Sequence, residues 1–332
     1  MTTIDTSAPG ERPARPNMAQ FLSRYGTFAA FILLLLFNLI VTPNFLSWQT
    51  LNVNLTQVAT IVIVAVGMTL VIATGGIDLS VGSLMAIAGT AAPMIFMGKL
   101  LPIENMGILI ILSFILPVLL AMAFGWFNGM LVTRFSIQPI IATLVLFIAG
   151  RGIAQVATNG NLQVFKNPDF QFIAMGRIAG IPAQVIIMII VAVLAHCLIR
   201  YTVIGRQIIA VGGNEKAARL TGIPVRRVKT FVYIVSGGLA GIAGLIVVAR
   251  NSASDANLVG LGMELDAIAA VAVGGSLLSG GRANIIGTVL GAFVIQLVRY
   301  TLLANGVPDA AALIVKAGLI IIAVFIQQRA KG

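Results

Sequence analysis

The sequence is poor in charged residues and in the side chains that enzymes use as nucleophiles or metal ligands. Asp, Glu, Lys and Arg make up 9% of the 332 residues, whereas a soluble domain carries about 25%. Cys197 and His196 are the single cysteine and the single histidine, so the chain can form no internal disulfide and offers no metal-ligand spacing. We therefore expect no metal site, and the sequence contains no Ser/His/Asp, Cys/His or paired-carboxylate arrangement typical of an enzyme.

A phosphate-binding loop is also missing. The motif G-x-x-x-x-G-K-[ST] needs a glycine before its lysine, and Val228 precedes Lys229-Thr230. We expect the chain itself to bind no cofactor and not to be an enzyme. Any ATP hydrolysis that is coupled to it is expected on another polypeptide.

Hydrophobic residues instead make up 59% of the sequence, and the mean hydropathy is +1.04. Several apolar runs approach the roughly 20 residues that cross a bilayer as a helix. The net charge of +11 comes largely from Lys and Arg in short segments beside these runs, a pattern typical of the positive-inside rule and not of nucleic-acid binding. The composition predicts an all-α polytopic membrane protein.

About ten transmembrane helices are expected, with both termini in the cytoplasm. Most Lys and Arg residues fall in segments that this topology places in the cytoplasm, as the positive-inside rule requires. The expected helices cover residues 27–41, 53–73, 81–97, 106–130, 139–157, 183–199, 230–249, 265–278, 283–303 and 310–326. The expected domains are a disordered tail (1–25), a transmembrane domain (26–328) that includes a cytoplasmic loop (200–229), and a C-terminal tail (329–332).

The stretch from Gly67 to Gly89 interrupts two apolar runs. Gly75-Gly76 is followed by Asp78 and then by Leu79-Ser80-Val81-Gly82. A charge in hydrocarbon is costly, so Asp78 must face protein, water or the interface. One interpretation is a helix break beside a substrate route, and the other is a tight cytoplasmic turn in which Asp78 caps the next helix.

A similar pattern occurs later in the chain. Gly75-Gly76-x-x-Leu79-Ser80-x-Gly82 recurs as Gly274-Gly275-x-x-Leu278-Ser279-x-Gly281. The match is short, but it is consistent with the structural duplication that is common in transporters.

The basic loop from Arg200 to Lys229 contains a segment with helix signals. Asn214 is a suitable N-cap, the residues from Glu215 to Leu220 favour a helix, and Gly222 is a natural stop. The sequence therefore predicts a short exposed helix in the largest cytoplasmic loop. The alternative is a solvated basic loop that only fixes the topology.

The segment GMTLVIATGGIDLSVGS (67–83) resembles the signature of the permease subunits of bacterial ribose-type monosaccharide ABC importers. The resemblance extends from about Phe45 to the C-terminus and is strongest to the galactofuranose and ribose branch. It implies an ABC importer permease fold in the inner membrane, a second permease subunit (the same chain or another), and an ABC ATPase subunit that binds ATP and Mg²⁺. It also implies a periplasmic sugar-binding protein, with membrane lipid as a further partner and no nucleic acid.

The resemblance also assigns roles to residues. The short helix resembles the coupling helix that inserts into a cleft of the ATPase subunit, and the matching positions are Gly213, Asn214, Ala217, Ala218, Arg219 and Gly222. Glu264-Leu265-Asp266-Ala267-Ile268 resembles a further stretch of the family. Asp266 there is either a polar entry to the translocation route or an acidic residue at a helix start, which the helix dipole favours.

Polar side chains on the spans offer further candidates. The expected members of the translocation route are Asn54, Gln57, Thr74, Asp78, Ser80, Asp266 and Gln296. Residues of this type also form interhelical hydrogen bonds in membranes. Cations expected on the periplasmic side and able to dock a binding protein are Lys166, Arg177 and Arg250. Arg151, Arg299 and Lys316 are expected either to snorkel to the interface or to pair with Asp266 or Asp309.

The main hypothesis is the transmembrane subunit of an ABC importer for galactofuranose, ribose or a related sugar. One alternative is a self-contained secondary transporter, which needs an ion-coupling group near the middle of the membrane. The expected topology leaves no acidic residue there. Another is an ABC permease for a non-sugar solute such as autoinducer-2.

Overall fold

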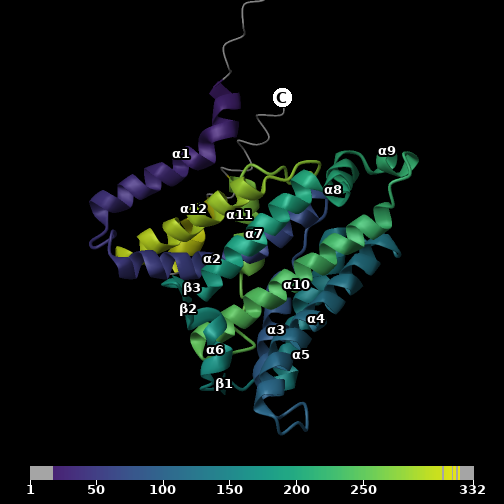
Figure 1. The fold of residues 1–332 in the computed structure, drawn as a ribbon. Coiled ribbons are helices and arrows are strands. Elements are labelled where there is room, and N and C mark those ends of the chain that lie inside the picture. Colours follow the sequence, from purple (N-terminus) through teal and green to yellow (C-terminus); the bar gives the residue numbers. More distant parts are fainter. Residues whose placement is uncertain (1–17, 309, 316, 319–320, 322–332) are drawn as a thin grey trace, which may run out of the picture.

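The computed structural model describes residues 18–308, 310–315, 317–318 and 321. They fold mainly into helices that pack side by side in a bundle (Figure 1). The elements of the bundle are α1 (Met18–Val41), α2 (Trp48–Ala73), α3 (Val81–Phe96), α4 (Met106–Thr133), α5 (Pro139–Thr158), α7 (Ala183–Tyr201), α10 (Val225–Asn251), α11 (Met263–Val273) and α12 (Ile285–Ala304). Two further helices, α8 (Val203–Gly213) and α9 (Glu215–Leu220), lie between α7 and α10.

Helix α2 is the centre of the bundle. It starts at the N-cap Ser47, whose hydroxyl accepts a hydrogen bond from the Thr50 amide at 3.1 Å. From Val58 to Ala73 its side chains are buried, because α7, α10, α11 and α12 all pack against it. Apolar residues cover α2 on every side, as expected of a helix that is enclosed by others.

Helix α10 is the second organising element and packs against α2, α3 and α4. Small residues let the backbones approach: a Cβ on Gly241 would lie 3.2 Å from the Cα of Val118 on α4. Small residues at helix contacts are typical of membrane bundles. The glycines of α10 therefore serve close packing.

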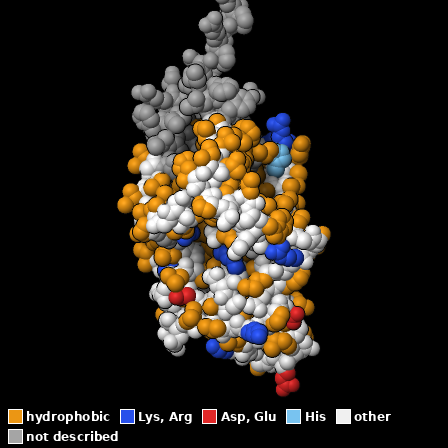
Figure 2. Space-filling model, turned by 90° about the vertical axis from the view of Figure 1, so that its left-hand side faces the viewer, with side chains coloured by type: hydrophobic (Ala, Val, Ile, Leu, Met, Phe, Trp, Pro, Cys, Tyr) orange, Lys and Arg blue, Asp and Glu red, His pale blue; other side chains and the backbone are white. Residues whose placement is uncertain are grey.

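The chain is a multi-pass membrane protein by the length and composition of its helices. Six helices, α2, α4, α5, α7, α10 and α12, are long and apolar enough to cross a bilayer, and shorter apolar helices cover Gly26–Val41, Val81–Phe96 and Val203–Gly213. Figure 2 shows hydrophobic side chains over much of one face, with acidic side chains only in its lower part. A helix lies at each of the first nine expected spans, but the count of ten stays a prediction, since much of 310–326 is outside the described residues.

Two expected boundaries differ from the structure. Helix α1 begins at Met18, so the last part of the expected tail (1–25) is helical, and 1–17 and 329–332 lie outside the described residues. In the basic loop, α7 ends at Tyr201 and α10 begins at Val225. The cations expected in a loop therefore lie on helices, whose backbone amides and carbonyls hydrogen-bond each other.

The segment between α5 and α7 folds at the end of the bundle away from α9 (Figure 1). It contains β1 (Gln163–Val164), α6 (Pro168–Met175), β2 (Arg177–Ile178) and β3 (Ile181–Pro182). Strand β1 pairs antiparallel with β4 (Ala253–Ser254), which follows α10, and β2 pairs with β3. Phe96, Phe165 and Phe170 pack with ring centroids 4.9 to 5.6 Å apart and anchor the segment to α3.

The helix ends in the two glycine patterns are alike, with a register that differs by one residue from the sequence match. Gly75 and Gly275 both have positive φ (81° and 79°) directly after α2 and α11. The amide of Gly75 bonds the Ile72 carbonyl at 2.8 Å, and that of Gly275 bonds Ala272 at 3.0 Å. Gly275 therefore matches Gly75, not Gly76.

Candidate functional site

The short helix α9 has a defined N-cap and a defined C-terminal stop. At its start the Asn214 Oδ1 accepts a hydrogen bond from the Ala217 amide at 3.0 Å. At its end Gly222 has a φ of +81°, a conformation that glycine adopts without strain. The Ile223 amide then bonds the Ala218 carbonyl at 3.1 Å. The helix, its cap and its stop are therefore confirmed where the sequence predicted them.

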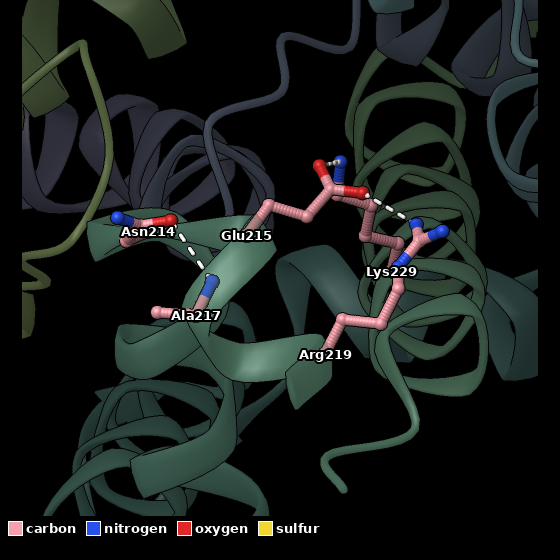
Figure 3. A network of polar contacts seen from close by, with 5 residues as sticks. All are labelled: Asn214, Glu215, Ala217, Arg219 and Lys229. Atoms are coloured by element: carbon pink, nitrogen blue, oxygen red, sulfur yellow. Dashed lines mark hydrogen bonds and ion pairs between the residues drawn. The ribbon is translucent and has the colours of Figure 1, made fainter. Parts of the chain in front are cut away.

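An acidic residue ties α9 to α10. Glu215 accepts hydrogen bonds from Lys229 at 2.6 Å and from Arg219 at 3.2 Å (Figure 3). Hydrogen bonding by the Lys229 ammonium lowers the pKa of the Glu215 carboxyl. The carboxylate therefore keeps its charge to lower pH than a free glutamate, and the ion pair links α9 to α10 through side chains.

The outer face of α9 combines one large apolar side chain with two cations. Leu220 is 89% exposed, and Lys216, Ala217 and Arg219 are exposed around it. Beside this face a cavity of about 300 Å³ opens between Arg219 and the first turn of α10, and its lining includes Arg226 and Arg227. We call Lys216, Ala217, Arg219 and Leu220 the α9 face.

Ala218 points the other way. It is 4% exposed and packs with Val211 of α8 and with Val225 and Val228 of α10. The expectation that Ala218 lies exposed for a partner's cleft is therefore wrong. The reason is that α10 begins earlier than expected, so its first turn covers this side of α9.

Asp78 lies in a second polar site, between α2 and α3. Its Oδ1 accepts bonds from the Ser80 amide (3.0 Å) and hydroxyl (2.6 Å), and its Oδ2 accepts from the Ser236 hydroxyl of α10 (2.8 Å). The Asn128 amide of α4 donates to the Ser80 hydroxyl at 2.9 Å. All four side chains are buried.

This geometry bears on both interpretations of Asp78, and the substrate route of the first stays a prediction. The helix break exists, because α2 ends at Ala73 and α3 starts at Val81. Ser80 directly precedes α3 and its own side chain makes no capping bond, whereas the Asp78 carboxyl accepts the Ser80 amide, the type of bond that an N-capping side chain makes. Asp78 also joins the break to α10 directly, through Ser236, and to α4 through Ser80 and Asn128.

The remaining route candidates lie apart from this network. Gln296 of α12 donates to Gln57 at 2.9 Å and to Asn54 at 3.4 Å, which is the interhelical bonding that such residues make in membranes. The hydroxyl of Thr74 donates to its own helix at Val71. Asp266 is buried in the first turn of α11, with Glu264.

The cations also divide into two groups. Lys166 and Arg177 are exposed on the segment with β1 and β2. Arg250 is half-buried and donates to the Thr56 carbonyl of α2 at 3.0 Å. Arg151 donates to the carbonyls of Ala256, Asn257 and Val259 at 2.9 to 3.2 Å, so it fastens a loop, a role that neither snorkelling nor pairing with Asp266 describes.

Comparison with known proteins identifies the class of this bundle. Residues 51–324 match the family described as branched-chain amino acid transport system / permease component. The chain belongs to this permease family. No solved structure matches the permease.

Curated relatives of the permease are named as subunits of sugar importers. It is 40% identical, over 98% of its length and 94% of the relative, to the galactofuranose transporter permease protein of Escherichia coli (strain K12). It is 41% identical to the ribose import permease protein of the same strain, over 87% of its own length and 88% of the relative. A fructose import permease protein of Bifidobacterium longum (strain NCC 2705) is 38% identical, over 92% and 87% of the two chains.

Some residues of these sites carried little signal in the sequence of the permease. Helix α8 was hidden in the basic loop, although Thr202 before it and the spacing of Gly205, Ile208 and Val211 are helix signals. Ser236 was not among the predicted site residues, because its bond to Asp78 joins positions far apart in the sequence. The sequence indicated Leu220 only as a residue that favours a helix.

The burial of Ala218 predicts unequal effects of one substitution at adjacent positions. Ala218→Arg places a charge among apolar side chains and is expected to lower the free energy of unfolding by at least about 2 kcal/mol. Ala217→Arg, on the exposed side, is the matched control and is expected to unfold like the native chain. Thermal unfolding of both in detergent checks this, and equal melting temperatures would contradict the placement of Ala218.

The Asp78 network predicts a large cost for losing its acceptor. Asp78→Ala leaves two hydroxyls and one amide without their partner, and is expected to cost about 1–3 kcal/mol. Glu104→Ala, at an exposed loop carboxylate, is the control. Thermal unfolding of Asp78→Ala, Ser236→Ala and the double variant measures the coupling, and strictly additive losses would show that Asp78 and Ser236 do not act together.

Proposed function

We propose that this chain is the transmembrane subunit of an ABC importer that carries a monosaccharide, such as galactofuranose, ribose or a related sugar, across the bacterial inner membrane. The observation that carries this is the similarity to sugar importer permeases along nearly the whole length of both chains. The proposed topology places both termini and α9 in the cytoplasm. The positive charge around α9 supports that side.

In this proposal a partner supplies the energy. The sequence has no phosphate-binding loop, so an ABC ATPase subunit binds ATP and Mg²⁺ and hydrolyses it. The α9 face is the proposed contact, because Leu220 is an exposed apolar side chain on the same short helix as the exposed cations Lys216 and Arg219. A partner groove with an apolar floor and an acidic rim would fit it. The expected contact residues Gly213, Asn214 and Gly222 act by holding α9 in place.

At the opposite end a periplasmic sugar-binding protein is the proposed partner. The segment with β1, α6 and β2 is folded and anchored by its phenylalanines, so it presents a fixed surface. Lys166 and Arg177 are exposed on it. Arg250 is left out of the proposed contact because it bonds α2. A second permease subunit completes the importer, and the sugar crosses between the two.

The test of the function is ATP-driven uptake. We expect the chain, reconstituted in proteoliposomes with its ATPase subunit and binding protein, to import labelled sugar with ATP and to continue when the proton gradient is collapsed. Leu220→Asp is expected to abolish co-purification of the ATPase and lower uptake at least about tenfold, since truncating a buried anchor costs 2 kcal/mol or more. Leu162→Asp, at an exposed leucine of the other end, is the control.

Uptake that depends on the gradient and proceeds without ATP would instead indicate a secondary transporter. Full ATPase association by Leu220→Asp would exclude the α9 face as the contact. Uptake by a panel of pentoses, hexoses and autoinducer-2 with the same binding protein identifies the solute class.

The proposed periplasmic contact predicts a salt-dependent defect. Charge reversal of Lys166 and Arg177 to Glu is expected to slow association with the binding protein, because exposed charges mainly set the association rate. The defect should shrink as ionic strength rises. Association rates at low and high salt measure it. Identical low-salt rates for the native chain and the double variant would remove these cations from the contact.

A further inference from the structure

Helix α9 is joined to α8 by a single residue on its N-terminal side. Asn214 is at once the C-cap of α8 and the N-cap of α9, and it has an extended backbone (φ −158°, ψ 100°). One residue therefore joins the two helices. Any displacement of α9 along this connection acts on the end of α8, at Gly212 and Gly213.

Gly212 lies directly against the two helix breaks. These are break A (74–80), between α2 and α3, and break B (274–284), between α11 and α12. A Cβ on Gly212 would overlap the carbonyl oxygen of Ala73 and lie 2.5 Å from the amide nitrogen of Gly281. Those two groups bond each other at 3.0 Å. Three backbones thus meet here with no side chain between them.

Each break is in turn bonded to the helices around it. In break A, Asp78 reaches Ser236 of α10, and Thr143 of α5 accepts from the Leu79 amide at 3.1 Å. In break B, the Ser276 hydroxyl accepts from the Asn284 amide at 3.0 Å, and Asn284 caps α12. A shift at Gly212 would therefore displace both breaks and the helices bonded to them, α5, α10 and α12.

We propose that Gly212 is a positioning residue through which movement of α9 reaches both helix breaks at once. This rests on the proposed function, in which an ATPase subunit moves α9. The tie from Glu215 to Lys229 reaches α10 through flexible side chains, whereas the contact at Gly212 joins backbones, which transmit small displacements without rotamer changes. Gly212 needs to be glycine because any side chain would force the breaks apart.

The test uses the complete importer with its ATPase and binding protein. Gly212→Ala is expected to keep the ATPase bound and to lower the amount of sugar imported per ATP hydrolysed at least about tenfold, since overpacking displaces backbone. Ala210→Ser adds one atom on the exposed side of the same helix and should leave this ratio unchanged. Equal ratios for the two variants, or release of the ATPase by Gly212→Ala, would overturn the proposal.

If Gly212→Ala does not insert into the membrane, a second pair of variants tests whether movement of α9 is transmitted through Gly212. Two glycines inserted between Gly213 and Asn214 leave the contact intact but add slack before α9, and should uncouple import from hydrolysis. The same insertion between Gly222 and Ile223 loosens the connection to α10 and should preserve more of the coupling. Equal losses from both insertions would overturn the proposal. Uptake that needs the proton gradient and not ATP would overturn the proposed function, and retention of the ATPase by Leu220→Asp would exclude the α9 face, so these failures are distinguishable from a failure of the Gly212 proposal.

Discussion

The fold depends on how two helices end within a packed bundle. Helices α2 and α11 stop at Ala73 and Val273, and the free carbonyls of a helix end must be bonded where water is scarce. Each stop solves this alike, with a positive-φ glycine and amide bonds back into the last turn. The Ala73 carbonyl is bonded by the Gly281 amide of the other break. The two breaks therefore stabilise each other.

This arrangement places the polar groups of the bundle where they connect the breaks to the surrounding helices. Asp78 is buried with three donors around its carboxylate, so the first break is fixed to α10 and the bonded Ser80 is fixed to α4. The end of α8 rests on both breaks. A cytoplasmic partner that acts on α9 would thus act on an element already in contact with the centre of the bundle, without a long mechanical path through lipid-facing helices.

Much of this was legible in the sequence because it depends on local signals. Asn214, the helix formers after it and Gly222 are all local signals for α9, and a helix lies at each of the first nine spans that the apolar runs predicted. The burial of Ala218 was not legible, because it depends on how α10 folds back over α9. The bonds of Arg250 and Arg151, and the pairing of Asp78 with Ser236, join positions far apart in the chain, so no local pattern encodes them.

The central claim is that α9 is the element through which the ATPase subunit acts on this permease. The most direct test is a structure of the assembled importer in the membrane with its ATPase bound. Our account predicts that α9 lies in a groove of the ATPase, with Leu220 buried and Ala218 still packed against α10. An ATPase subunit bound elsewhere on the permease, with Leu220 exposed, would contradict it.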